Sequence, residues 1–189
     1  NSLNPELVCR LADAWDAINS GAVANGSGAA WSAMLDLARQ GLATLAAYQR
    51  ILGKDPDGAR NPAYPVHLDV DNLIDYMIVN LYGGNSDWPH KNYWVGRDAS
   101  AASTGFKFYM WDSEWSLGLQ SSLTTDRTTV ASGVAEPYAL LRASPEFRLR
   151  VGDRLQRALF AGGPLFVDPA APAWDPARPE RNQPAARFV

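Results

Sequence analysis

The sequence contains one cysteine and only two histidines among its 189 residues. A lone Cys9 excludes both an intrachain disulfide and a cysteine-based zinc site. His67 and His90 follow no spacing that is typical of zinc ligands, so we interpret both as polar loop residues. These shortages exclude a disulfide-stapled domain and any recognisable zinc enzyme.

The chain also has no large excess of charge of either sign and no long apolar run. The formal net charge is only −3, which gives no electrostatic reason to expect nucleic acid or an anionic membrane as a partner. The longest apolar stretch, residues 73–82, is interrupted by Asp75 and Asn80, so we expect no membrane span. The chain begins at Asn1 without Met or a signal peptide, and we expect it to be a piece of a longer protein.

Tryptophan, by contrast, is abundant, with seven residues in the chain. Four of them, Trp88, Trp94, Trp111 and Trp115, fall within one short segment. We expect these rings to pack around a site and hold it rigid, while the other interpretation is an aromatic platform for a sugar. The composition therefore directs the search for function to this segment.

Hydrophobic spacing predicts a chain that is mostly helical. A first helix is expected over residues 4–20, where an Asn-Pro-Glu capping signal precedes an apolar face that includes Trp15 and Ile18. Further helices are expected over residues 31–52, 69–83, 136–142 and 144–161, the first of them passing or breaking at Gly41. Residues 53–67 hold three Pro and two Gly, which is typical of a loop.

Two aromatic runs, residues 92–95 and 106–111, are separated by a link of small residues. β-favouring runs around such a link predict a β-hairpin. The predicted fold class is therefore α+β, mostly helical with one hairpin. We expect a domain over residues 1–163, followed by a Pro-rich extended segment over residues 164–189.

The residues around this hairpin have the order found in phosphoryl-transfer enzymes. Asp87 and Asn92 have the spacing of the protein-kinase catalytic loop, in which Asp accepts or orients a substrate hydroxyl and Asn ligates magnesium. Asp112 follows the hairpin, where the next metal-binding Asp of that order stands. ATP phosphates and divalent cations need hard oxygen ligands from separate loops. We therefore expect the hairpin to hold Asn92 close to Asp112.

An ordinary protein kinase is nevertheless excluded. Asn-Ser-Asp at residues 85–87 replaces the usual His-Arg-Asp, and Asp-Ser-Glu at residues 112–114 replaces Asp-Phe-Gly. The Arg and the Gly of the two kinase signatures are thus absent.

The sequence resembles the CotH kinase family, named for a spore coat protein kinase. The central motifs are NSDWPHKNYW at residues 85–94 and FYMWDSE at residues 108–114. The similarity extends to LDVDNLIDYM at residues 68–77, SPEFR at residues 144–148 and FAGGPL at residues 160–165. It runs from about residue 4 to the end of the chain.

This resemblance implies an atypical protein-kinase-like fold, of which the chain is the mostly helical C-terminal part. It implies transfer of phosphate from ATP to Ser, or to Thr, with Mg²⁺ or Mn²⁺ as the metal. Asp87 then stands as the catalytic acid/base, Asp112 as the metal-binding carboxylate and Asn92 as a second metal ligand. The family's nucleotide-binding lysine and glycine-rich-like region are expected before Asn1.

Two further residues are candidates for the same site. Lys91 is a candidate phosphate contact, or else a solvated lysine. Glu114 is a candidate further metal ligand, or else a surface partner for a cation. The principal residues also have structural interpretations: Asp87 in an Asx-turn, Asn92 as a cap of the hairpin and Asp112 as a turn residue at the end of a strand.

Two other functions fit the same residues. The first is a non-catalytic coat, surface-adhesion or structural protein on this fold. The second is a hydrolase with paired carboxylates, either Asp87 with Asp112 or Asp112 with Glu114. We favour the kinase because the order of Asp87, Asn92, the hairpin and Asp112 suits phosphoryl transfer better. The expected substrate is a protein with a Ser-rich acceptor segment, and the resemblance alone favours a bacterial protein that is secreted or at the cell or spore surface.

Overall fold

The computed structural model describes residues 15–160, 162–168, 170, 175 and 177. It divides into two compact units, Asn1–Phe147 and Arg148–Val189. The described elements are, in chain order, β1 (Trp15–Asn19), β2 (Ala22–Asn25), α2 (Ala29–Arg39), α3 (Leu45–Ile51), α4 (Val70–Gly83), β3 (Tyr93–Asp98), β4 (Lys107–Met110), η1 (Gly133–Ala135), α5 (Glu136–Leu141) and α6 (Pro145–Leu159). The α+β class is thus confirmed, whereas the predicted boundary at residue 163 stays a prediction.

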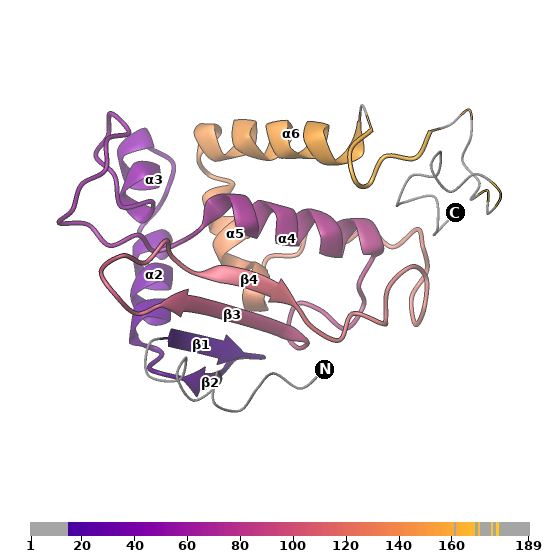
Figure 1. Ribbon diagram of the computed structural model, residues 1–189, viewed down its shortest axis with the longest axis horizontal. Helices are drawn as coiled ribbons and strands as arrows, with labels where there is room; N and C mark the ends of the chain where they lie inside the picture. The colour runs from indigo at the N-terminus through magenta and orange to yellow at the C-terminus, as the bar shows by residue number, and fades with distance from the viewer. Residues whose placement is uncertain (1–14, 161, 169, 171–174, 176, 178–189) are drawn as a thin grey trace. The chain divides into compact units, whose positions relative to one another are not determined.

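The first unit contains a four-stranded antiparallel sheet in the order β2-β1-β3-β4 (Figure 1). Ile18, Val95 and Phe108 lie opposite one another on three neighbouring strands, and all three are buried. Because side chains alternate along a strand, this row marks the core face of the sheet. The predicted hairpin is confirmed as β3 and β4, but the sheet is larger than one hairpin.

The first predicted helix is wrong where the structure describes it. Residues 15–19 form β1, in which Asp16 and Ile18 are buried and the other three residues are only partly so. The three-residue separation of Trp15 and Ile18 suggested a helix, but pairing with β2 and β3 decides the outcome because strand propensity depends on such partners. The start of the predicted helix lies outside the described residues.

The later helices confirm the sequence-based predictions. The apolar region over residues 31–52 forms α2 and α3 and breaks at Gly41, whose φ is 108°. Helix α4 begins after Asp69, whose side chain accepts a hydrogen bond from Asn72 N, and it ends at Gly84 in the left-handed conformation. These are the expected acidic N-cap and glycine C-cap.

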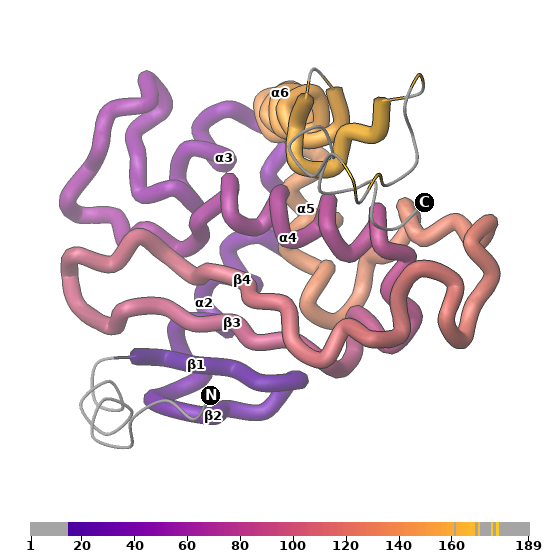
Figure 2. Tube along the Cα trace, turned by 45° about the vertical axis from the view of Figure 1, so that its right-hand side comes forward, coloured from indigo at the N-terminus to yellow at the C-terminus, as the bar shows by residue number. Residues whose placement is uncertain are grey.

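Helix α4 runs beside the β3–β4 hairpin (Figure 2) and holds its edge strand. Asn72 Oδ1 accepts from Phe108 N at 2.5 Å, and Asn72 Nδ2 donates to Phe108 O at 3.3 Å. Asp69 N donates to Phe106 O at 3.0 Å, and the Asp69 carboxylate pairs with Lys107 Nζ at 2.6 Å. These bonds occupy the free edge of β4, which would otherwise need other partners. These bonds therefore fix the hairpin relative to α4, and with it the positions from which the loops after α4 and after β4 begin.

The core of the first unit lies between the sheet and the helices. Trp31 on α2 packs against Phe106 with ring centroids 5.2 Å apart, and against Phe108 at 6.1 Å. Leu73 and Met77 on α4 are fully buried. Aromatic contacts of this kind bury large apolar surfaces, so they hold the hairpin at a defined position.

The second unit begins within α6 and contains its C-terminal turns. Beyond the helix, Leu165 N donates to Ala158 O at 2.9 Å, which returns the chain to the helix end. In neither unit does a helix of the described residues combine the length and the apolar character that crossing a bilayer requires.

Candidate active site

Two buried asparagines fix the loop that carries Asp87. Asn85 Nδ2 donates to Asn80 Oδ1 at 3.0 Å, and Asn85 N donates to Asn80 O at 3.1 Å. Asn85 Oδ1 in turn accepts from Asp87 N at 3.2 Å. Because buried polar groups must find partners, this pair determines how the chain leaves α4. The turn around the side chain of Asn85 also replaces the Asx-turn that the sequence offered for Asp87.

The next residues of the loop are held from two sides. Trp88 Nε1 donates to Tyr76 Oη at 2.7 Å, and burial raises the pKa of the Tyr76 hydroxyl, so this acceptor on α4 stays neutral. Pro89 O accepts from Val134 N at 3.2 Å. Gly133 has φ of 59°, and a Cβ there would lie 2.5 Å from Pro89 O, so glycine is required. The loop is therefore a rigid part of the first unit.

Asn92 connects the two segments that the sequence singled out. Its Nδ2 donates to Asp87 Oδ2 at 2.7 Å and to the backbone O of Asp112 at 3.3 Å. The predicted closeness of Asn92 and Asp112 is thus confirmed. Both residues adopt left-handed backbone conformations, with φ of 56° and 50°, which Asn and Asp tolerate better than most residues. Since the amide nitrogen makes both bonds, Oδ1 of Asn92 is left as an acceptor.

The β1–β2 turn holds the backbone of Asn92. Ser20 Oγ accepts from Asn92 N at 3.2 Å, and Ser20 N donates to Tyr93 O at 3.2 Å. Ser20 Oγ also donates to Asn19 Oδ1 at 2.9 Å, which fixes the hydroxyl rotamer. Residues more than seventy positions upstream therefore hold the backbone from which the bridging side chain of Asn92 projects.

The segment after Asp112 returns to the loop that carries Asp87. Ser86 donates twice to Trp115 O, from N at 2.8 Å and from Oγ at 3.0 Å. Leu117 N donates to Gly83 O at 2.6 Å. The backbone on both sides of Asp112 is thus tied to the start of the site, on one side through Asn92 and on the other through Ser86.

Exposure differs among the predicted site residues. Asp87 and Asn92 are partly buried, whereas Lys91, Asp112 and Glu114 are exposed. Within the described residues neither Lys91 nor Glu114 has an ion-pair partner. The arrangement presents a partly shielded carboxylate, that of Asp87, joined through the amide nitrogen of Asn92 to the backbone of an exposed aspartate, Asp112.

The tryptophans around the site do not all pack as predicted. Trp88 is buried, but Trp111 is 56% exposed and Trp115 is 38% exposed. Trp94 contacts Trp111 edge to face, with ring centroids 6.2 Å apart. Strand alternation places Trp94 on the face of the sheet opposite the core. The prediction of a rigid aromatic cluster is therefore wrong for Trp111 and Trp115.

The donor set fits a divalent cation only with Asn92 included. Among the described residues no three His, Cys, Asp or Glu side chains converge to hold a metal. Asn92 Oδ1 and the Asp112 carboxylate are hard oxygen donors of the kind that Mg²⁺ and Mn²⁺ prefer. Because Mg²⁺ is usually bound by one or two protein ligands together with phosphates and water, these residues fit such an ion.

Three residues of this site were missed by the sequence reasoning. Asn80 had a readable signal, because it is a polar residue within the most apolar stretch of the chain and is only 1% exposed. Asn85 had a weaker one, its place directly after the glycine cap of α4. Ser20 had none, because its role depends on β1 being a strand beside β3.

The family model described as CotH kinase protein matches residues 42–160. This range contains α4, the β3–β4 hairpin and the loops with Asp87, Asn92 and Asp112. No curated protein and no solved structure matches the chain. Because the match covers well over half of the sequence and includes the segments that carry Asp87, Asn92 and Asp112, the chain belongs to the CotH kinase family and has a kinase-like α+β fold.

Proposed function

We propose that this protein is a protein kinase that uses ATP with Mg²⁺ or Mn²⁺ to phosphorylate Ser, and also Thr, of other proteins. The observation that carries the proposal is the Asn92 amide, which joins the Asp87 carboxylate to the backbone of Asp112. Phosphoryl transfer depends on positioning and electrostatics more than on covalent chemistry. A fixed base beside two metal-ligating oxygens supplies both.

The chemical step assigns one role to each residue. Asp87 Oδ2 is held by Asn92, and Oδ1 has no hydrogen bond from the described residues. Oδ1 of Asp87 therefore takes the proton of the substrate hydroxyl. The hydroxyl oxygen bonds to the γ-phosphorus of ATP, and the bond between that phosphorus and the bridging oxygen breaks, with its electron pair leaving on ADP. A bound divalent cation would neutralise the phosphate charge, and Asn92 Oδ1 and the Asp112 carboxylate would hold it.

Two exposed residues complete the proposed site. Glu114 stands two positions after Asp112 and would add a carboxylate ligand to the metal. Lys91 stands next to Asn92 and would act on a phosphate as a point charge. Their exposure, and the lack of ion-pair partners for either in the described part of the chain, suits groups that meet a ligand rather than the protein.

The substrate proposed is a protein with a Ser-rich acceptor segment, secreted or at the cell or spore surface. The partial exposure of Asp87 supports a polypeptide acceptor, since the hydroxyl must reach the carboxylate from solvent. We do not propose the paired-carboxylate hydrolase, because the order of Asp87, Asn92, the hairpin and Asp112 suits phosphoryl transfer better.

The decisive experiment measures transfer of labelled γ-phosphate from ATP by the intact protein. With Mg²⁺ or Mn²⁺ and a Ser-rich acceptor, we expect transfer that Asp87→Asn abolishes. Asp57→Asn removes an exposed loop carboxylate and serves as the matched control, with transfer retained. Undiminished transfer by Asp87→Asn would reject the proposed role of Asp87.

A second measurement separates the kinase from a non-catalytic coat or adhesion protein on the same fold. ATP with metal is expected to raise the melting temperature of the intact protein, and Asp112→Ala is expected to remove that rise. If ATP and metal neither shift the melting temperature nor support transfer, the non-catalytic function is favoured.

A further inference from the structure

A cavity of about 280 Å³ lies near the end of β3 that is farther from Asn92. Two loops form it, residues 60–66 after α3 and residues 97–103 at the tip of the β3–β4 hairpin. The polar residues that line it are Arg60, Tyr64, Arg97, Ser100 and Ser103, and no acidic residue is among the lining residues. Because β-strands rise by about 3.3 Å per residue, Arg97 lies roughly 16 Å along the chain from Asn92.

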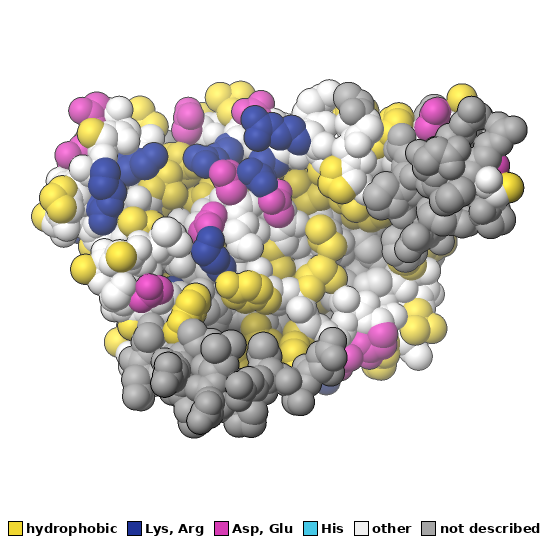
Figure 3. Space-filling model, viewed as in Figure 1, with side chains coloured by type: hydrophobic (Ala, Val, Ile, Leu, Met, Phe, Trp, Pro, Cys, Tyr) yellow, Lys and Arg dark blue, Asp and Glu magenta, His cyan; other side chains and the backbone are white. Residues whose placement is uncertain are grey.

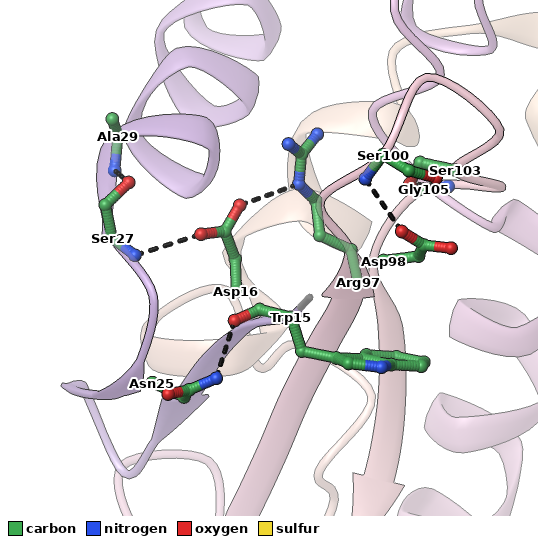
Figure 4. Close-up of polar contacts among 10 residues, drawn as sticks. All are labelled: Trp15, Asp16, Asn25, Ser27, Ala29, Arg97, Asp98, Ser100, Ser103 and Gly105. Carbon is green, nitrogen blue, oxygen red and sulfur yellow. Dashed lines mark hydrogen bonds and ion pairs between the residues drawn. The ribbon is translucent and has the colours of Figure 1, made fainter. Parts of the chain in front are cut away.

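Arg97 uses one guanidinium nitrogen, Nε, in a hydrogen bond within the protein, and its two terminal nitrogens remain available to a ligand. Its Nε donates to Asp16 Oδ2 at 3.0 Å, and Asp16 Oδ1 accepts from Ser27 N at 2.9 Å. Figure 4 shows the two terminal nitrogens of Arg97 on the side of the guanidinium away from Asp16. A guanidinium has five N–H donors, so four of them remain for a ligand.

Arg60 brings a second guanidinium that has no acidic partner among the described residues. Its Nη1 donates to the backbone oxygens of Gly53 at 2.6 Å and Tyr64 at 2.7 Å, and to that of Asn61. These bonds fix the group on the loop without neutralising its charge. Two fixed cations therefore line the cavity. Arg97 is paired with Asp16, and the Asp98 carboxylate, which accepts from Ser100 N at 2.7 Å, is close enough to feel its charge.

A third cation packs against Tyr64, one of the lining residues. The guanidinium carbon of Arg50 lies 3.3 Å from the centre of the Tyr64 ring, and its Nη1 is buried without a hydrogen-bond partner. The pKa of His67 is lowered by burial first and then by the charges of Arg50 and Arg97. Figure 3 shows Lys and Arg side chains over α3 and the loop that follows it, with Asp or Glu side chains beside them.

We propose that this cavity binds a phosphate monoester carried by a peptide, that is, a phosphorylated side chain of a protein partner. Two guanidinium groups match the charge and the several acceptor oxygens of a phosphate better than those of a single carboxylate. Ser103 Oγ already accepts from Gly105 N at 3.2 Å, so its O–H is left to donate to the ligand. The volume is just under the usual range for small-molecule pockets, which favours a side chain over a nucleotide.

The proposed site is separate from the candidate active site and does not require kinase activity. Where the proposed function also holds, a segment phosphorylated earlier could dock here while another Ser of the same substrate reaches Asp87. That consequence alone rests on the proposed function. Binding at the cavity is measured directly, so a failed binding test and a failed transfer test are distinguishable.

The first test measures binding of fluorescent peptides to the intact protein by anisotropy. A phosphoserine peptide is expected to bind at least about tenfold more tightly than the same peptide with Ser or Glu, because charge-assisted bonds to phosphate are the stronger ones. Equal binding of the three peptides would overturn the proposal. Displacement of the phosphopeptide by an equal concentration of inorganic phosphate would assign the cavity to free phosphate, and displacement by ATP would assign the peptide to the active site.

The second test uses variants with opposite expected effects. Arg97→Gln is expected to weaken phosphopeptide binding by at least about tenfold, and Asp16→Asn to strengthen it, because it removes the opposing charge. If the Asp16–Arg97 pair only supported the structure, both variants would weaken phosphopeptide binding. Arg39→Gln makes the same charge change on α2 and is the control, and a loss there equal to that of Arg97→Gln would overturn the assignment.

The double variant Asp16→Asn with Arg97→Gln covers the case in which Arg97→Gln fails to fold. It keeps two side chains that can hydrogen-bond but removes both charges, so folding is retained while binding of the phosphopeptide falls. Ser103→Ala adds a milder change on the other side of the cavity. Unchanged binding in both the double variant and Ser103→Ala would reject the site.

Discussion

The two ends of β3 carry different chemistry on one strand. At the first end, Asn92 stands in a left-handed conformation and connects Asp87 to the backbone of Asp112 through its side-chain amide. Beyond the middle of the strand, Arg97 forms a shielded ion pair with Asp16 on the core face of the sheet. The first end carries the carboxylates of Asp87 and Asp112, and the second lines a small cavity with the guanidinium groups of Arg60 and Arg97. A strand rooted in the core can therefore hold two opposite charge environments apart.

The difference also separates function from stability. Asp87 has a single side-chain hydrogen bond, to Asn92, and leaves one carboxylate oxygen unused by the described residues. Both carboxylate oxygens of Asp16 are used, by Arg97 and by the backbone of Ser27. A carboxylate with an unused oxygen suits reaction with a ligand, whereas a fully bonded one suits a structural role.

The largest expected effect is on the rate, at the first end. Asp87→Asn keeps the size of the side chain but removes the base, so phosphate transfer should fall by roughly 10²- to 10⁴-fold. The urea unfolding midpoint should stay close to that of the wild type, because the amide can still accept from Asn92. A large loss of stability in Asp87→Asn would show that this carboxylate is structural, like Asp16.

The next effect is on stability, at the second end. Arg97→Met leaves the Asp16 carboxylate buried without its cation, which should lower the free energy of unfolding by about 3–5 kcal/mol. Urea denaturation measures this change. The double variant Asp16→Leu with Arg97→Met should recover most of the loss, because no uncompensated charge remains. A loss of the same size in the double variant would mean that packing, rather than charge, is responsible.

A smaller effect distinguishes the backbone of Asn92 from its side chain. Asn92→Ala and Asn92→Gly both remove the amide, and both should abolish phosphate transfer. Glycine accepts φ of 56° without strain, so Asn92→Ala should be less stable than Asn92→Gly by about 1–2 kcal/mol. Thermal denaturation of the two variants compares them directly. Equal stabilities would contradict the left-handed conformation at this position.

The smallest effect is a pH dependence near the second end. Burial, with the charges of Arg50 and Arg97, lowers the pKa of His67 below its usual 6.5. The folded protein therefore binds fewer protons than the unfolded chain, so the contribution of His67 to stability is complete above pH 6.5 and is lost as the pH falls through the folded pKa.

Urea midpoints of the wild type and His67→Gln between pH 7.5 and pH 5 test this expectation. The wild type should lose more stability than the variant over that range. His90→Gln removes the exposed histidine and provides the comparison. Parallel curves for the wild type and His67→Gln would contradict the lowered pKa.

The candidate site was predicted from the sequence where local signals were strong. The cap at Asp69, the apolar face of α4 and the glycines after it located the loop with Asp87. Two aromatic runs located the hairpin that brings Asn92 to Asp112. The buried Asn80–Asn85 pair was not predicted, because the partner of a buried polar side chain depends on where the chain turns.

The second end of β3 was not predicted at all. Asp16 and Arg97 are 81 residues apart in the sequence and meet only because β1 pairs with β3. Residues 15–19 satisfied a helical spacing equally well, so the local pattern was misleading. Without that strand there was no reason to place Arg97 beside Asp16 or to expect a cavity between two loops.

The sequence by itself therefore determined the family, the α+β class and the order of Asp87, Asn92 and Asp112, because capping, periodicity and motif spacing are local properties. Only the tertiary structure decided that Ser20 orients Asn92, that Trp111 and Trp115 are exposed, and that Arg60 and Arg97 share a cavity. Each of these depends on which strands pair and which faces are covered, and long-range pairing of this kind is decided by the whole chain.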